Sequence, residues 1–391
     1  MRLWRKVSGL VKDQNSIFIA SLSRRTPLRN PDIEAAVIKA TSHDEFSMNM
    51  KNVDRVFRWL RLSSCNLKPL IWAITIRIEK TRSWVVAIKV LILMHGLYST
   101  RLPCVQRIGR LPFDLSNFED GHSRKHQMHG INAFIRAYFA FLDQKSSLLC
   151  MELHEKRSNN NMMIIMHNLD VEEKENYSIV QDLVVVQKLQ SLLDVLLEIK
   201  PLSDSAIVPL VLEAMDCVMT EIFDLYSRIR NGIARVLSKI NLFGKVEATM
   251  ALKIIKKANI QAEELSLYFE FNRDIGVRNA EVCPIVEQIS NEDIKEIEEI
   301  INGVSDTAQK SDEMVRAIVV HENFGEKKDL KSNLRTIITD RWETFDEENG
   351  GCSAIVKYIP RTNPFEASLV PTNSTNNVPI KPQELPDLIS F

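Results

Sequence analysis

The sequence is poor in the residues and patterns that most catalytic and nucleotide-binding folds require. Only 12 of its 391 residues are glycine, which argues against a β-rich fold, and no glycine-rich phosphate-binding loop is present. Strict alternation of apolar and polar residues never persists for long, so strands are not predicted. The six cysteines form no CxxC pair, which is typical of reduced thiols in a cytosolic protein and not of a zinc site or a disulfide framework.

Constellations of catalytic or metal-binding residues are also lacking. Neither a nucleophile elbow nor a paired carboxylate site can be found. Three histidines in HSRKHQMHG, namely His122, His126 and His129, have a metal-like spacing, but no carboxylate or thiol lies nearby in the sequence after Asp120. We therefore expect exposed polar histidines, no metal, no cofactor and no enzymatic activity.

No apolar run is long enough to cross a membrane. The best candidate, SWVVAIKVLILMHGL, is about 15 residues long and contains Lys89, so it predicts a buried core helix. Near the start, Lys12 and Asp13 interrupt any secretory signal. Arg2 stands where myristoylation requires glycine.

The net charge of −1 hides a division along the chain. Residues 1–145 contain 24 Lys and Arg against 11 Asp and Glu, so that part carries +13 and the remainder carries −14. A basic front suggests that this part faces an anionic surface, which is either a membrane or nucleic acid. Because the chain has no recognition-helix motif, zinc module or interleaving of aromatic and basic residues, nucleic acid is not the expected partner.

The first twelve residues, MRLWRKVSGLVK, contain four cations and no acid. Wound as a helix, their cations lie opposite an apolar arc of about 120°, formed by Leu3, Trp4, Val7, Leu10 and Val11. Three explanations are compatible with this pattern: a first helix packed on the core, an organelle presequence, or an interfacial helix that inserts Leu3, Trp4 and Val7 between lipid headgroups. A helix of this length is only marginally stable in water. We therefore also consider that it forms on contact with its binding partner.

Helical patterns fill most of the first 271 residues. Asn30-Pro31 marks a helix start, because asparagine caps and proline suits the first helical position. A second helix is predicted to begin near Ser47, with further helices at 66–80, 83–97, 101–110, 127–157, 177–200, 207–240 and 245–271. Loops are expected at PFDLSNFEDG and around Asn159. The fold class is therefore all-α, with antiparallel helices stacked as a superhelical solenoid.

The composition changes near residue 290. Residues 291–350 hold 16 acids against 8 bases, and after Gly350 the chain is rich in Pro, Asn, Ser and Thr. Such a segment cannot bury enough apolar surface to offset its ordering entropy. We divide the chain into a basic amphipathic segment (1–24), a helical domain (25–290) and a largely disordered tail (291–391).

A stripe of cations lies on the second predicted helix. Lys51, Arg55 and Arg58 are spaced i, i+4 and i+7, facing away from an apolar stripe formed by Val53, Val56, Phe57 and Leu60. The turn before this helix can bring Lys39 beside them. Converging cations without compensating acids predict a site for a multiply phosphorylated headgroup, and the alternative is a solvated helix face.

Four segments together resemble one known family. KATSHDE, SWVVAIKVLILMHGL, PFDLSNFEDG and INAFIRAYFAFLDQK occur in this order, and they are similar to the ANTH domain of clathrin assembly proteins in the ENTH/ANTH superfamily, most of all to its plant members. The resemblance covers the chain from its start to roughly residue 290. It implies a superhelical stack of helices that binds phosphatidylinositol 4,5-bisphosphate through a surface motif on the first helices.

The resemblance assigns the lipid motif to particular residues. Its first lysine corresponds to Lys39 and its third basic position to Lys51, whereas Asn49 and Asn52 occupy the other two positions. Arg55 and Arg58 can compensate electrostatically for these two asparagines. His43, near Lys39, is a further candidate headgroup ligand.

The resemblance also implies that the tail recruits coat components and that the protein works in endocytosis. The expected locations are clathrin-coated pits and vesicles of the plasma membrane, with the Golgi as a second location. Asn363, Pro364 and Phe365 form an NPF tripeptide of the type that EH domains bind, because Phe365 projects from a tight turn. The terminal LPDLISF resembles motifs that bind clathrin and the adaptor complex. An alternative function is a helical scaffold for other proteins, such as vesicle SNAREs, with a partner helix in a groove lined by Ile222, Leu225 and Ile229.

Overall fold

The computed structural model describes residues 2–121, 129–165, 171–283, 286 and 288–303. Within these residues the fold is all-α, as predicted, and the only β-type pairing is an isolated bridge between Thr26 and Arg29. The helices are α1 (Arg2–Ser21), α2 (Pro31–Ala40), α3 (Met50–Leu62), α4 (Leu67–Glu79), α5 (Trp84–Ser99), α6 (Pro103–Gln106), α7 (His129–Ile165), α8 (Val171–Leu197), α9 (Pro209–Leu237), α10 (Lys245–Asp274) and α11 (Asn291–Gly303).

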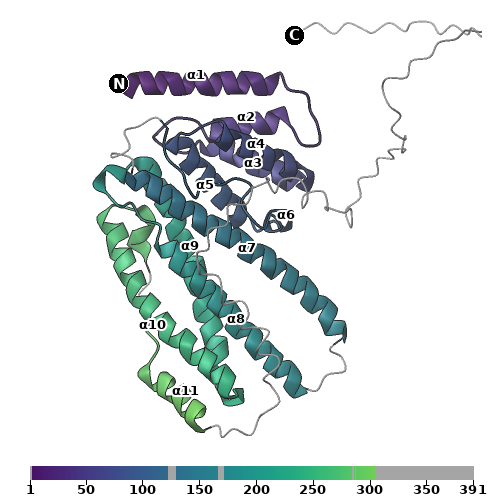
Figure 1. Cartoon of the computed structure of the whole chain (residues 1–391), viewed down its shortest axis with the longest axis vertical. Helices are drawn as coiled ribbons and strands as arrows, with labels where there is room; N and C mark the ends of the chain where they lie inside the picture. The colour runs from purple at the N-terminus through teal and green to yellow at the C-terminus, as the bar shows by residue number, and fades with distance from the viewer. Residues whose placement is uncertain (1, 122–128, 166–170, 284–285, 287, 304–391) are drawn as a thin grey trace, which may run out of the picture. The chain divides into compact units, whose positions relative to one another are not determined.

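Helices that are neighbours in sequence pack against each other along most of the described chain. Helix α1 lies along α2, α2 contacts α3 and α4, and the long helices α7, α8 and α9 follow one another side by side (Figure 1). Helix α5 contacts α4, α7 and α9, and every residue from 85 to 95 is buried. Its apolar run is therefore a core helix, as the sequence predicts.

Two helix starts are capped by asparagine side chains, at Asn30 as predicted and at Asn49, for which no cap was predicted. Asn30 accepts a hydrogen bond from the Asp32 amide (3.1 Å) in front of α2. Asn49 does the same for the Asn52 amide (3.3 Å) in front of α3. Because each cap satisfies an amide that has no partner within its helix, the boundaries of α2 and α3 are fixed locally.

Three element boundaries differ from the sequence prediction. The helix expected at 101–110 is only the short α6, because Arg101 (φ 54°) and Gly109 (φ 79°) adopt left-handed conformations that no helix accommodates. Helix α7 continues through Asn159, where a loop was expected, since propagating a long helix costs little at a residue of modest helix propensity. Helix α11 lies in the segment predicted to be disordered and packs on α10.

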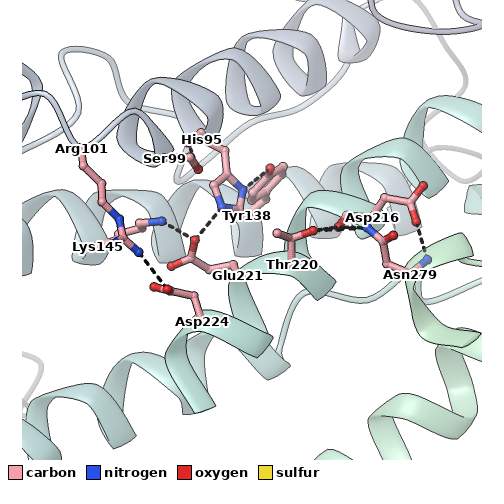
Figure 2. Close-up of polar contacts among 10 residues, drawn as sticks. All are labelled: His95, Ser99, Arg101, Tyr138, Lys145, Asp216, Thr220, Glu221, Asp224 and Asn279. Atoms are coloured by element: carbon pink, nitrogen blue, oxygen red, sulfur yellow. Dashed lines mark hydrogen bonds and ion pairs between the residues drawn. The ribbon is translucent and has the colours of Figure 1, made fainter. Parts of the chain in front are cut away.

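A buried polar junction joins α5, α7 and α9 (Figure 2). His95 shares a hydrogen bond with the Tyr138 hydroxyl through Nδ1 (2.8 Å) and contacts Glu221 through Nε2 (3.1 Å). Lys145 donates to the same Glu221 oxygen. Three helices distant in sequence are therefore held by one carboxylate.

Within this junction Glu221 and Lys145 form an ion pair, whereas His95 is neutral. Burial lowers the pKa of His95 despite the nearby Glu221 carboxylate, so its ring is neutral at pH 7. Burial alone would raise the pKa of Glu221, but the hydrogen bond from His95 and the charge of Lys145 outweigh it and lower this pKa to about 2. Lys145 is thus the ionic partner, and a neutral His95 donates through Nε2.

Around this junction, two further sets of contacts fasten the helices. Arg101 pairs with Asp224 at the exposed end of the cluster (2.9 Å). The Asn279 amide donates to the Asp216 carboxylate (3.1 Å), and the Asn279 side chain donates to Thr220 (3.2 Å), as Figure 2 shows. The second set fixes the segment after α10 against α9.

We predict that Glu221→Gln destabilises the full chain by about 3 kcal/mol at pH 7, because Lys145 loses its counter-ion in a buried position. The wild-type contribution is present above pH 4.5, the ordinary pKa of glutamate, and is lost as the pH falls toward 2. Urea unfolding at a series of pH values measures both effects. Asp224→Asn, at the exposed Arg101 pair, is the control and should cost less than about 1 kcal/mol. Equal losses in the two variants would contradict the assignment.

Candidate functional site

Helix α1 turns most of its large apolar side chains away from the core, with Ile17 half-buried. Along this helix the buried positions include only small or polar residues, Gly9, Asp13 and Ala20. Helical spacing puts an outward row on the opposite face, where Gln14 and Asn15 lie between its first three and its last two apolar members. These members are 54–70% exposed: Val7, Leu10, Val11, Phe18 and Leu22. The orientation is the reverse of an ordinary surface helix.

This orientation bears directly on the three explanations for the amphipathic start. Helix α1 does pack on α2, but the residues that it buries are Gly9, Asp13 and Ala20 and not those of the predicted apolar arc. A Cβ added at Gly9 would lie 2.7 Å from the Cβ of His43, so only glycine allows this close approach. Of the three predicted insertion residues, Val7 is 54% exposed, whereas the side chains of Leu3 and Trp4 lie outside the described part.

A buried carboxylate holds α1 in place. Asp13 accepts the backbone amide of His43 (2.8 Å), the Nδ1 of the same residue (2.8 Å) and the guanidinium of Arg77 (2.5 Å). Arg77 also donates to the carbonyl of Thr41 (2.8 Å). We call Asp13, His43, Arg77 and Thr41 the α1 clamp, since it joins α1, α4 and the segment after α2.

The charges of the clamp balance within the protein. Burial alone would raise the pKa of Asp13, but the hydrogen bonds from His43 and the positive charge of Arg77 lower it below its ordinary value. The Arg77 side chain is only 4% exposed, so it depends on Asp13 for a counter-ion. His43 is only 11% exposed and its Nδ1 is taken by Asp13. It therefore belongs to the clamp, and the geometry does not present it beside the exposed cations.

The other predicted headgroup residues are on the surface. Lys39 is exposed in the last turn of α2, and Lys51, Arg55 and Arg58 are exposed along one side of α3. The opposite side of α3 buries Val53, Val56 and Leu60, with Phe57 half-buried. None of the four cations forms an ion pair with any residue that the structure describes. Asp54 is the exposed acid on the same helix.

Several surface residues near these cations were missed by the sequence reasoning. Arg61, one turn beyond Arg58, is also exposed. Phe46 (59% exposed) precedes α3, and Met50 (58% exposed) is its first residue. The helical spacing of the cations on α3 predicts the position of Arg61. The exposure of Phe46 depends on the path of the loop before α3, which the sequence does not predict.

A second cationic feature lies between α1, α2 and α4. A cavity of about 450 Å³ is lined by these helices and by the segments that follow α2 and α4. Its basic lining residues are Lys12, His43, Arg77, Lys80 and Arg82. Glu34, which also lines the cavity, pairs with Arg29 (2.9 Å). No local pattern in the sequence predicts this cavity, because it forms only when α1, α2 and α4 pack together.

One predicted interaction surface is contradicted by the structure, and two predicted tail motifs lie outside the residues that it describes. Ile222, Leu225 and Ile229 are at most 3% exposed, so the groove expected for a partner helix is wrong at these residues: they pack inside the helix stack. The NPF tripeptide and the terminal LPDLISF lie outside the described residues, as do His122 and His126.

Comparisons with known proteins place the helical part in one family. Residues 32–303 match the family model described as "ANTH domain". A protein of Arabidopsis thaliana described as "Putative clathrin assembly protein" is 43% identical over the full length of both chains, and a second of the same description is 40% identical, also over both full lengths. A third Arabidopsis protein, a clathrin coat assembly protein, is 26% identical over 77% of this chain and 50% of its own length.

We predict that Asp13→Asn loosens α1, because Arg77 keeps its buried charge and loses the carboxylate that balances it. The expected loss of stability is about 2–4 kcal/mol, together with faster hydrogen exchange of the α1 amides. The control is Asp32→Asn, since Asp32 pairs with Arg25 on the surface and exposed pairs contribute about 1 kcal/mol or less. Unchanged exchange in α1 would show that the clamp does not hold this helix.

Proposed function

The chain belongs to the ANTH domain family, and from this premise we propose that it is a membrane adaptor for clathrin coats. In this proposal the helical domain binds membrane that contains phosphatidylinositol 4,5-bisphosphate. The tail then recruits clathrin, the adaptor complex and EH-domain proteins, which promotes coat assembly and vesicle budding. Its place of action is the cytoplasmic face of coated pits and vesicles at the plasma membrane, and the Golgi is a second candidate.

The observation that carries the proposal is the outward apolar row of α1. Large apolar side chains gathered on one exposed side of a helix mark a site of contact with a membrane or another protein. A basic amphipathic helix lying in the plane of the headgroups buries such a row while its cations meet anionic lipid. The outward residues from Val7 to Leu22 extend over four turns, so we propose that α1 lies flat along its length, with Leu3 and Trp4 continuing the row.

The exposed cations of α2 and α3 supply the second contribution. Lys39, Lys51, Arg55 and Arg58 carry charge without an ion-pair partner among the described residues, so a phosphorylated headgroup gains their attraction without breaking an existing pair. Each basic residue near an anionic membrane contributes about 1 kcal/mol. We propose that these four residues contact the headgroup, while His43 acts through the clamp by ordering α1.

Neither contribution is sufficient alone. None of the helices in the described part of the chain is long and apolar enough to cross a membrane, so the proposed attachment is peripheral. One weak anchor gives only marginal, reversible binding, and two together give a stable one. We therefore propose that headgroup attraction and insertion of α1 act together.

For the tail, the proposal rests on sequence and on relatives. Asn363, Pro364 and Phe365 are the proposed EH-domain ligand, and LPDLISF is the proposed contact with clathrin or the adaptor complex. The printed names of the relatives refer to clathrin assembly, which supports coat recruitment as the role of this chain.

We predict that changing Lys39, Lys51, Arg55 and Arg58 together to Glu weakens binding to phosphatidylcholine vesicles containing phosphatidylinositol 4,5-bisphosphate by on the order of a hundredfold or more. Vesicle flotation over a salt series measures it, because screening reduces this attraction in the wild type. A matched control changes four exposed cations elsewhere to Glu: Lys156, Arg157, Lys200 and Arg278.

A third variant locates the headgroup. Changing Lys80 and Arg82 to Glu alters only the cavity between α1, α2 and α4. If this variant loses binding and the fourfold α2–α3 variant does not, the headgroup occupies the cavity and our assignment is wrong.

We predict that Leu10→Ser combined with Val11→Ser weakens vesicle binding by about tenfold and leaves its salt dependence in place, because each side chain loses on the order of 1 kcal/mol of apolar burial. The stability of the free protein should not fall, since both side chains already face solvent. Leu202→Ser with Leu242→Ser is the control, as these residues are exposed elsewhere. Equal binding of the two double variants would refute insertion of α1.

A further inference from the structure

One hydroxyl residue of this chain stands in a distinctive position between α1 and α2. The chain has 14 prolines, and Pro27 alone among them follows a serine or threonine. Thr26 precedes it, and Arg24 and Arg25 come just before. Some protein kinases select substrates with proline directly after the hydroxyl residue. Their pocket would leave an ordinary backbone amide at that position without a hydrogen-bond partner, whereas proline has no amide hydrogen to leave unpaired.

The local geometry presents the Thr26 hydroxyl to solvent. Thr26 and Arg29 exchange two backbone hydrogen bonds, of 2.9 and 3.1 Å, around a turn formed by Pro27 and Leu28. Proline suits this second position of a turn, and the residue before it is kept extended. Thr26 is exposed, and no hydrogen bond of its hydroxyl is found within the described ranges.

The surroundings of the turn are basic and apolar. Arg25 pairs with Asp32, and Arg29 pairs with Glu34 (2.9 Å), so the nearby acids are already engaged. Two large apolar side chains flank the turn, with Leu22 70% exposed and Leu28 57% exposed. Leu22 ends the outward row of α1, so a charge placed at Thr26 lies at the edge of the surface proposed to enter the membrane.

We propose that Thr26 is a phosphorylation site for a proline-directed protein kinase, and that its phosphate releases the C-terminal end of α1 from the membrane. The kinase transfers the γ-phosphoryl group of ATP to Thr26 Oγ1. An O–P bond forms at Thr26, the bond from the γ-phosphorus to the bridging oxygen of ADP breaks, and the hydroxyl proton passes to a base of the kinase. The membrane effect rests on the proposed function, whereas the modification itself does not.

The effect of the phosphate follows from its charge. A phosphothreonine carries about −1.5 to −2 at pH 7 and accepts strong hydrogen bonds from arginine. It opposes the attraction that Arg24 offers to anionic lipid, and it raises the cost of removing water from Leu22 and Leu28. Because each charge near such a surface changes binding several-fold, we expect vesicle affinity to fall by about tenfold.

The first experiment tests the modification on the full purified chain. We expect incubation with ATP, Mg²⁺ and a proline-directed kinase to add one phosphate, and peptide mass spectrometry to locate it at Thr26. Thr26→Ala removes the acceptor, and Pro27→Ala keeps the hydroxyl while removing the feature that the kinase reads. Hydrogen exchange of α1 and α2 checks that both variants fold. Phosphate on another residue, or undiminished phosphorylation of the folded Pro27→Ala variant, overturns the site.

The second experiment compares flotation of phosphorylated and unphosphorylated wild-type chain with phosphatidylcholine vesicles, with and without phosphatidylinositol 4,5-bisphosphate. About tenfold weaker binding of the phosphorylated form, unaltered in Thr26→Ala after the same treatment, supports the switch. Equal binding of the two wild-type forms overturns it. If the unphosphorylated chain fails to bind any vesicle, the proposed function and the switch both fail, while the mass spectrum still decides the site.

Discussion

The burial of the Asp13 carboxylate between His43 and Arg77 decides which face of α1 the protein shows to its surroundings. A helix with this sequence would ordinarily turn Val7, Leu10 and Val11 toward the core. Here the carboxylate gains three hydrogen bonds only if its own side of the helix faces inward. Gly9 and Ala20 make that side small enough to pack closely, and the apolar row is left in solvent.

The clamp extends into the rest of the fold through α5. Lys89, fully buried in α5, donates to the Ser42 hydroxyl (3.3 Å) in the segment that also supplies His43, and burial lowers the pKa of Lys89. Further along the same helix, His95 meets Glu221 of α9. Helix α5 therefore connects the polar groups under α1 to the junction that fastens the long helices. Buried polar groups of this kind need all their partners in place, so the orientation of α1 depends on the stack as a whole.

The sequence predicts those features that depend on local patterns. The apolar run from Val85 to His95 predicts a core helix, and Asn30 with Pro31 predicts the start of α2, because both signals lie within a few residues of their effect. The orientation of α1 cannot be predicted in this way, since the partners of Asp13 lie 30 and 64 residues away. For the same reason the sequence predicts neither the pairing of His43 with Asp13 nor the burial of Ile222, Leu225 and Ile229 inside the helix stack. Asn49, which replaces a motif lysine, has a local role that only the structure reveals, the cap of α3.

The depth of individual α1 side chains in a bound membrane tests the account most directly. A photoreactive benzoylphenylalanine placed at Val11 reports the outward row, and one placed at Ser16 reports the side that lines the cavity. On vesicles containing phosphatidylinositol 4,5-bisphosphate, the account predicts crosslinks to lipid acyl chains from position 11 and none from position 16. Crosslinks from position 16 alone, or from neither position while the protein remains bound, would contradict it.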